Sequence, residues 1–430
     1  MPAAELNSAP IGADEAGALF GWIADRPALA VAVSGGRDSM TLLRLMERWA
    51  GGREKPARII ALTVDHGLRT GSLDDARQVS EWCAAIGVEH HCLSWTGIKP
   101  RTRIQERARE ARYRLMTDWC SVHGIGALAL AHHQDDQAET FLMRLARSSG
   151  VDGLAAMEHA SLRDGIEILR PLIDIPRTRI EATLADFDQT WIDDPSNENS
   201  AFERVRIRKN MGALAGLDIA APAIAASAAK LARAADALSH ITDARFSALA
   251  NVDAAGFATL DGEALAREPQ EIALRVMARV IRLVGGRERL SDGALARTTA
   301  SMTDGNATSL TMGGCCISRT SGKILVVRES RSLPRRSISP GVTTIWDDRF
   351  TVSLGVRETD VELAALGKRG FAAARRLNPL LQPIPPRAGW VLPGGFRAGG
   401  LALAPNLDID GAESSLSVRF LRADTMFKHD

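Results

Sequence analysis

The chain has 430 residues, of which 45% are hydrophobic and 24% charged, as in folded globular proteins of two or three domains. Its net charge of +1 argues against a protein that is basic overall, so any surface for nucleic acid has to be local. Five cysteines without a C-x-x-C pair argue against a disulfide framework or a zinc site and indicate a cytosolic chain with reduced thiols. No signal-peptide pattern is seen near the N-terminus, and no uncharged apolar run reaches about 18 residues, so no membrane span is expected.

The most informative stretch is a turn between a predicted strand and a predicted helix. Residues 28–33 are apolar and partly β-branched, which predicts a buried parallel strand. The sequence S-G-G-R-D-S follows at 34–39, and apolar residues at helical spacing come after it. Two glycines allow backbone N–H groups to approach an anion, and Asp38 or Ser39 can cap the helix whose positive end faces that anion. The stretch is therefore predicted to bind phosphate.

The pattern also indicates which type of phosphate site this is. The P-loop needs G-x-x-x-x-G-K-[ST] and the dinucleotide fingerprint needs G-x-G-x-x-G, and neither pattern is present. S-G-G-x-D-S instead resembles the pyrophosphate loop of N-type ATP pyrophosphatases, which split ATP between its α and β phosphates. The alternative is an ordinary glycine-rich turn. Asp38 argues against that alternative, because a carboxylate beside phosphates is unfavourable unless a cation lies between them.

Strands and helices alternate along the next hundred residues. Further strands are predicted at 58–64, 88–93 and 127–131, and helices at 73–86 and 101–122. This alternation predicts an α/β fold with a doubly wound, mostly parallel sheet, in which ligands bind at the carboxyl ends of the strands. Ser34, Asp65 and His132 follow three such ends. The functional site is therefore expected at this edge of the sheet.

The fourth strand leads into a cluster of histidines and acids in the segment H-H-Q-D-D-Q-A-E at 132–139. On the helix predicted here, Ala138, Leu142 and Leu145 are expected to form the buried stripe. Asp135 and Glu139 are four residues apart and share a face beside it, while Asp136 projects about 100° away from Asp135. Two histidines and three carboxylates at one strand end indicate metal and acid–base chemistry. Magnesium carried by ATP suits the carboxylates better than zinc, since no histidine pair at i,i+4 is present. The alternative is a capped helix with solvated acids.

A first candidate for RNA contact is the helix predicted before that strand. Residues 101–114 hold six arginines against two glutamates. Arg103, Arg107 and Arg114 line one flank of the helix, as expected for contact with a phosphate backbone. The alternative is a solvated helix face.

A second candidate is the segment E-R-V-R-I-R-K at 203–209, which has a local charge of +3. In an extended conformation, Arg204, Arg206 and Arg208 alternate onto one face, which suits contact with successive phosphates. The alternative is that these arginines pair with acids inside the protein.

The sequence changes in character after about residue 211, where an alanine-rich helix is predicted. A second amphipathic helix is predicted at 271–284, followed by β-rich segments at 309–317 and 323–329. Residues 331–340 are rich in Ser, Arg and Pro, as linkers are. The predicted organisation is a catalytic domain at 1–212, a linker helix with a smaller α+β domain at 213–330, and a linker with a β-containing C-terminal domain of open role at 331–430.

Several motifs occur together in the order found in one enzyme family. They are S-G-G-x-D-S at 34–39, V-D-H-G-L-R at 64–69, Q-E-x-A-R-x-x-R-Y at 105–113, A-H-H-x-D-D-Q-x-E-T at 131–140, R-P-L at 170–172 and D-x-S-N at 194–197. With this set the chain resembles the tRNA(Ile)-lysidine synthetases, bacterial tRNA-modifying enzymes of the pyrophosphate-loop superfamily. The β-rich pair at 309–329 also resembles the substrate-binding domain of that family.

The resemblance implies a ligase that attaches free L-lysine to C2 of the wobble cytidine of the tRNA(Ile) with a CAU anticodon. The tRNA is adenylated first, and pyrophosphate and AMP are released. ATP and Mg²⁺ are the implied cofactors, and a cytoplasmic location is expected. The oligomeric state stays open.

The resemblance also implies roles for individual residues. The expected ATP-binding residues are Ser34, Gly35, Gly36, Arg37, Asp38, Ser39, Asp65 and His66. Asp38 and Asp135 are expected to hold magnesium, and His133 to stabilise charge near the α-phosphate. Asp135 or Glu139 is expected to orient the lysine amine or to take its proton. The expected tRNA contacts are Arg103, Arg107, Arg112, Arg114, Arg204, Arg206 and Arg208.

Other functions share parts of this pattern. A tRNA thiolase has the same loop and substrate class, but usually needs a cysteine pair or iron–sulfur ligands. A small-molecule ligase such as an amidotransferase subunit has the loop, but does not explain the arginine rows. A non-catalytic RNA-binding protein could keep a degenerate nucleotide fold, against which the intact acidic cluster argues. An assay for exchange between ATP and pyrophosphate distinguishes such a non-catalytic protein from the enzymes, because only an enzyme that forms an adenylate catalyses the exchange.

Overall fold

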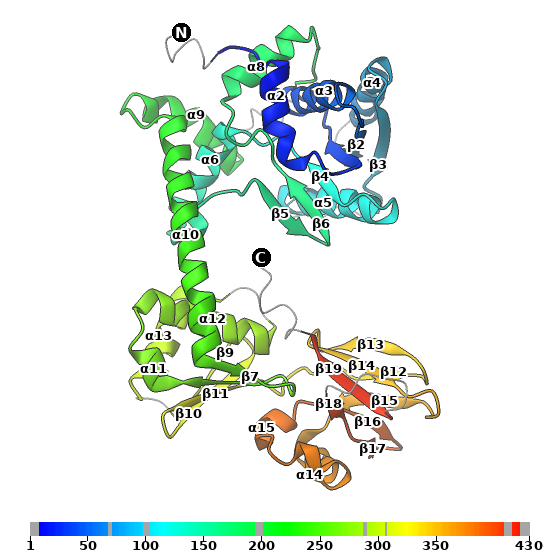
Figure 1. Cartoon of the computed structure of the whole chain (residues 1–430), viewed down its shortest axis with the longest axis vertical. Helices are drawn as coiled ribbons and strands as arrows, with labels where there is room; N and C mark the ends of the chain where they lie inside the picture. Colours follow the sequence, from blue (N-terminus) through cyan, green and yellow to red (C-terminus); the bar gives the residue numbers. More distant parts are fainter. Residues whose placement is uncertain are drawn as a thin grey trace. The chain divides into compact units, whose positions relative to one another are not determined.

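The computed structural model describes residues 8–67, 71–97, 104–193, 201–286, 290–305, 308–407 and 415–421. The chain forms two compact units, Met1–Asp236 and Ala237–His429. Helix α10 (Ala221–Leu249) begins in the first unit and ends in the second (Figure 1). The domain boundaries expected near 212 and 330 stay predictions.

The first unit is built on a six-stranded sheet with the order β3-β2-β1-β4-β6-β5. Its strands are β1 (Ala28–Ala32), β2 (Arg58–Asp65), β3 (Glu89–Ser94), β4 (Ala127–Ala129), β5 (Ala160–Arg163) and β6 (Ile166–Leu169). All neighbouring strands pair in parallel except β5 and β6, which are antiparallel. The predicted doubly wound, mostly parallel sheet is thus confirmed, while the β5–β6 hairpin was not predicted.

Helices cover both faces of this sheet (Figure 1). The helices of this unit are α2 (Ala13–Phe20), α3 (Arg37–Gly51), α4 (Ser72–Ala85), α5 (Ile104–Val122), α6 (Gln134–Leu145), α7 (Val151–Leu154), α8 (Arg177–Asp186) and α9 (Glu203–Ala215), with a 3-10 turn at Gly21–Ile23, and α3, α4 and α5 pack directly on the strands. Alternate residues of β1 enter two separate cores: Leu29 and Val31 lie in one, and Ala30 lies in the other. Burial on both faces explains why this strand is continuously apolar.

Two local predictions were wrong. Leu145, expected in the buried stripe of its helix, lies at the end of α6 and is half exposed. Segment 203–209, expected to be extended, forms the first two turns of α9. In that helix Val205 is buried, whereas Arg204 and Arg208 lie one turn apart on the same face.

The second unit begins with a five-stranded sheet, order β7-β8-β11-β10-β9, formed by β7 (Ala250–Val252), β8 (Ala258–Asp261), β9 (Ser309–Met312), β10 (Cys315–Thr320) and β11 (Lys323–Arg328). Helices α11 (Gly262–Ala266), α12 (Gln270–Gly285) and α13 (Asp292–Thr303) contribute to the same hydrophobic core as this sheet. Two glycines at 313 and 314, both with positive φ, divide the predicted β segment 309–317 into β9 and β10.

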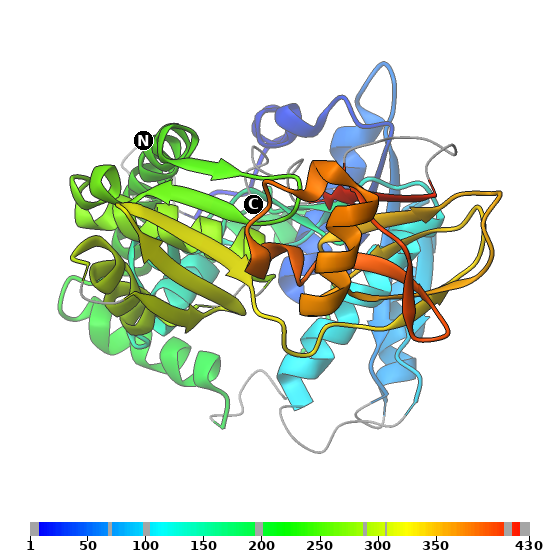
Figure 2. The same ribbon diagram turned by 90° about the horizontal axis from the view of Figure 1, so that it is seen from below.

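The C-terminal part holds two four-stranded sheets, β12-β15-β16-β17 and β13-β14-β19-β18, that share one hydrophobic core. The strands are β12 (Arg336–Ile338), β13 (Thr343–Trp346), β14 (Phe350–Leu354), β15 (Val361–Ala365), β16 (Pro393–Arg397), β17 (Gly400–Leu403), β18 (Asn406–Leu407) and β19 (Leu416–Phe420). Helices α14 (Gly367–Leu377) and α15 (Pro386–Gly389), with a 3-10 turn at Pro379–Leu381, lie beside these strands (Figure 2). Across the described ranges, no helix is both long and apolar enough to cross a bilayer.

Candidate active site

The loop predicted to bind phosphate joins β1 to the N-terminus of α3, and its own hydroxyl groups shape it. The Ser34 N–H donates to Ser39 Oγ at 3.1 Å, and Ser39 Oγ donates to the Gly36 carbonyl at 2.8 Å. The Gly36 N–H points to Ser34 Oγ at 3.4 Å. The loop therefore closes on itself at the positive end of a helix, where an anion is favoured.

Gly35 occupies a position that only glycine fits. Its φ is +80°, and a Cβ atom built there lies 2.8 Å from the side chains of Ile192 and Val79. The Ile192 N–H also donates to the Gly35 carbonyl at 2.9 Å. The segment that follows α8 therefore holds the loop from outside.

His133 lies at the centre of the acidic cluster and is 2% exposed. Its Nε2 is 3.6 Å from Asp38 Oδ2 and 3.5 Å from Asp136 Oδ2, and its Nδ1 is 3.8 Å from Asp135 Oδ2. Burial alone lowers the pKa of His133, but the hydrogen bond with Asp38 and the charges of the surrounding carboxylates raise it above its ordinary value. The structure thus brings the loop and the histidine cluster together, as the sequence predicts.

Asp38 and Asp135 have the chemistry that magnesium requires. Burial raises the pKa of Asp38, but the hydrogen bond with His133 and nearby cationic groups lower it, so the carboxylate is ionised. Its Oδ1 is buried and has no hydrogen-bond partner within the described part of the chain. Asp135 Oδ2 accepts the Arg177 N–H at 3.1 Å. Mg²⁺ commonly binds one or two carboxylates together with substrate phosphates, so these residues fit the ion.

Glu139 is 2% exposed and is bound by α9 rather than by the loop. Arg204 Nε donates to Glu139 Oε2 at 2.5 Å, and Arg208 Nε donates to Glu139 Oε1 at 2.6 Å. Arg204 Nη2 also donates to Asp136 Oδ1 at 2.8 Å. Asp135, expected to share a face with Glu139, accepts instead from the Arg177 N–H. Asp136 shares a partner with Glu139, since Arg204 donates to both carboxylates. The catalytic role of Glu139 stays a prediction.

Arg37, expected to bind ATP, turns toward α8. Its guanidinium pairs with Glu181 and stacks on Trp191, with 5.1 Å between its central carbon and the ring. Glu181 also accepts from Arg177 Nε at 3.1 Å. Since Arg177 donates its N–H to Asp135, α8 connects the loop with the histidine cluster.

The remaining predicted residues lie at the sheet edge or on helices. Asp65 is the last residue of β2, which pairs with β1, and His66 follows it; Asp65 Oδ1 accepts the Gly67 N–H at 2.8 Å. On α5, Arg107 and Arg114 are exposed and Arg112 is half buried; on α9, Arg206 is exposed. Arg103, the L-R of the 64–69 motif and the D-x-S-N motif at 194–197 lie outside the described residues.

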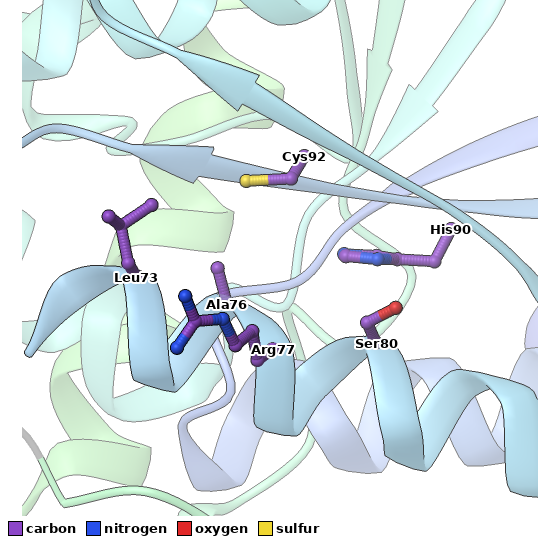
Figure 3. Close-up of a pocket in the computed structure, with 6 residues that line it drawn as sticks. All are labelled: Leu73, Ala76, Arg77, Ser80, His90 and Cys92. Carbon is purple, nitrogen blue, oxygen red and sulfur yellow. The ribbon is translucent and has the colours of Figure 1, made fainter.

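A pocket of about 330 Å³ lies between α4 and β3 (Figure 3). It is lined by Leu73, Ala76, Arg77, Ser80, His90 and Cys92. Burial and the nearby charge of Asp65 raise the pKa of Cys92, so its thiol stays protonated. None of the predicted site residues lines this pocket.

His132 has surroundings opposite to those of His133. Burial and the charges of Arg109, Arg204 and other arginines lower its pKa well below the ordinary value, so the folded protein keeps the imidazole neutral. Between that lowered value and about 6.5, the unfolded chain binds a proton that the folded chain does not, so stability falls as the pH drops below about 6.5.

We therefore expect His132→Gln to change the pH dependence of stability. Between pH 7.5 and pH 5.5, the wild type should lose about 1 kcal/mol more of its free energy of unfolding than the variant does. Urea unfolding at the two pH values measures both losses. Taking the difference cancels the opposite contribution of His133. A constant difference across this range contradicts a neutral His132.

Several residues of the site had no predicted role. Arg177, Glu181 and Ile192 come from the segment after β6, which no local pattern connects with the loop. Arg109 and Arg170 lie within the quoted motifs Q-E-x-A-R-x-x-R-Y and R-P-L, and their place in those motifs is the signal that could have found them.

Comparison with known proteins shows which family the chain is similar to. Residues 14–214 match the model of a family described as a PP-loop domain. A tRNA(Ile)-lysidine synthase of Bradyrhizobium diazoefficiens is 41% identical over 65% of this chain and 79% of its own, and one of Ruegeria pomeroyi is 37% identical over 80% of both chains. A solved U34-tRNA thiolase of Methanococcus maripaludis has a TM-score of 0.41 and 18% identity, covering 48% of this chain and 71% of its own.

Proposed function

The chain belongs to the tRNA(Ile)-lysidine synthase family, a group of tRNA-modifying ligases that use ATP, and from this membership we propose how its residues act. The substrates are the tRNA(Ile) with a CAU anticodon, ATP and free L-lysine. The C2 carbonyl oxygen of the wobble cytidine attacks the α-phosphate, and pyrophosphate leaves. The ε-amine of lysine then attacks C2, and AMP leaves with the oxygen. We place this reaction in the cytoplasm, to which the five free cysteines are suited.

The observation that carries the proposal is the meeting of the loop, Asp38, His133 and Asp135 at the ends of adjacent strands. Ser34, Gly35, Gly36 and Ser39 hold the phosphates of ATP at the N-terminus of α3, and Asp65 and His66 flank the nucleotide. Asp38 and Asp135 would hold magnesium, which neutralises charge on the phosphates when bound. His133, which lies between Asp38 and Asp135, donates a hydrogen bond where charge builds at the α-phosphate.

Asp135 is better placed than Glu139 to take the proton of the lysine amine. Its side chain is 37% exposed, whereas that of Glu139 is 2% exposed and bound by two guanidinium groups. We propose that Glu139 acts by holding Arg204 and Arg208 in place. The proposed tRNA contacts remain Arg107, Arg112, Arg114 and Arg206. Arg204 and Arg208 are already paired with Glu139, so they would contact RNA only while keeping these ion pairs.

The proposal is tested with tRNA carrying a CAU anticodon, ATP and radiolabelled lysine. We expect label to enter the tRNA, with one AMP and one pyrophosphate released per lysine. The same tRNA with uridine at the wobble position is the control and should stay unlabelled. Without lysine, the tRNA should become adenylated. Pyrophosphate release without any transfer of label in the complete reaction contradicts the proposed ligation.

A further inference from the structure

A group of cationic side chains surrounds Tyr113, the single tyrosine of the chain, which is 3% exposed. Arg109 Nη2 donates to the Tyr113 hydroxyl at 3.2 Å, and the central guanidinium carbons of Arg109 and Arg112 lie 5.1 Å and 6.0 Å from the ring centre. Arg170, which follows β6, also hydrogen-bonds with Tyr113. We call the set Arg109, Arg112 and Arg170, whose charges all act on the neighbouring His132, the arginine nest.

The positive charge of the arginine nest is only partly balanced by acids: burial lowers the pKa of Arg170, and the nearby charge of Glu158 acts in the opposite direction. Within the described residues, no ion pair joins Arg109, Arg112 or Arg170 to a carboxylate. By contrast, Arg163, which stacks on the same ring at 4.3 Å, pairs with Glu110 at 2.6 Å. Burial and the charge of Arg109 lower the pKa of Arg112, which shows that these like charges repel one another. An anion bound among them relieves that repulsion.

We propose that the arginine nest binds a backbone phosphate of the RNA substrate beside the nucleotide that reacts. The inference rests on the proposed function, since it takes the RNA to be the tRNA substrate. The nest adjoins the catalytic cluster because His132 directly precedes His133. Arg109 is exposed, and Arg107 and Arg114 are exposed on the same helix, so the positive charge continues from the nest to the surface, as a polyanion requires.

The other anions of the reaction fit the nest less well. Free lysine has two ammonium groups against one carboxylate, so guanidinium groups that are only partly balanced repel it overall. The phosphates of ATP have their own site at the Ser34–Ser39 loop, where the α3 N-terminus and Asp38 face them. A phosphodiester has no positive group, and arginine forks match its oxygens.

The test compares Arg109→Ala and Arg170→Ala with the matched control Arg163→Ala, which removes a guanidinium from the same ring but one that Glu110 already neutralises. Affinity for unmodified tRNA is measured without ATP or lysine between about 50 and 200 mM salt. Each nest variant should bind tRNA about tenfold more weakly at fixed salt. Its slope of log affinity against log salt should fall by about 0.7–0.9. The control should keep the wild-type slope, and KM for ATP and for lysine should stay unchanged in all three.

An unchanged slope in both nest variants overturns the proposal. A raised KM for lysine with that slope unchanged assigns the nest to the amino-acid carboxylate, and a raised KM for ATP assigns it to the nucleotide. Because Arg170 also donates to the Glu158 carbonyl and Ser161 Oγ, Arg170→Lys, which keeps the charge and should keep the slope, controls for lost stability. Wild-type lysine transfer is scored separately. If the wild type transfers no lysine but the nest variants have lowered slopes, the proposed function is wrong and the nest still binds RNA. If the wild type transfers lysine but the slopes are unchanged, only the proposal for the nest is wrong.

Discussion

Asp38→Asn is expected to lower the rate of pyrophosphate formation by about 10²–10³, while tRNA binding stays at the wild-type level. The substitution keeps the size of the side chain but removes the charge that faces the loop and His133. Asp38 Oδ1 is buried without a partner in the described structure, so its charge is available to a cation held with the phosphates. The rate is measured with saturating tRNA and ATP over a series of magnesium concentrations.

Two controls accompany this measurement. Thermal unfolding of Asp38→Asn should stay close to that of the wild type, because no ion pair with lysine or arginine is broken in the described structure. Asp193→Asn changes a carboxylate that accepts only from Trp191 Nε1 among its described contacts, and should leave the rate unchanged. Near-normal pyrophosphate formation by Asp38→Asn at saturating magnesium removes Asp38 from the site.

Glu139→Gln is expected to lower the free energy of unfolding by about 2–3 kcal/mol. The charge lost is 2% exposed and holds two guanidinium groups, whose side chains are 31% and 36% exposed. Breaking a fully buried pair costs about 3–5 kcal/mol, and the partial exposure of the arginines reduces that cost. Urea unfolding measures the change.

The matched control is Glu203→Gln on the same helix, α9. Glu203 pairs with Arg147 at the surface, where such a pair contributes about 0–1 kcal/mol. The two half-reactions then show whether Glu139 also handles lysine. If it only holds α9, adenylation and transfer slow together. Accumulation of adenylated tRNA, with stability unchanged, contradicts the holding role and makes Glu139 a lysine contact.

Much of the first unit could be predicted because its signals are local. Strand β1 is apolar on both faces, and the predicted end of this strand differs from the observed one by a single residue. The predicted cap was wrong, because α3 begins at Arg37 with Gly36 as its N-cap, so that Asp38 and Ser39 lie inside the first turn. The position of Ser34, Asp65 and His132 at the carboxyl ends of three strands also follows from the sequence, since parallel strands place these ends at one edge of the sheet. The two carboxylates proposed to hold magnesium, Asp38 and Asp135, were assigned from the family resemblance, and the type of their side chains agrees with that assignment.

The α9 segment could not be predicted, because its pattern fits two structures. Arg204, Arg206 and Arg208 alternate, as in a strand, yet Arg204 and Arg208 are also four residues apart, as on one face of a helix. The contact with Glu139 favours the helix over the strand, since both arginines donate to its carboxylate in the helical conformation. That carboxylate lies in a distant part of the sequence, and no local rule includes it.

The contact between the loop and α8 has a consequence for the order in which the protein is synthesised. Arg37 and its partner Glu181 are 144 residues apart, and the carbonyl of Gly35 accepts its hydrogen bond from the N–H of Ile192, which is also far along the chain. During translation, β1 and the loop leave the ribosome long before α8 does. A nascent chain that ends before α8 therefore has every residue of the S-G-G-R-D-S motif but neither contact that holds it. We therefore expect a nascent chain to bind ATP only after α8 and Ile192 have left the ribosome.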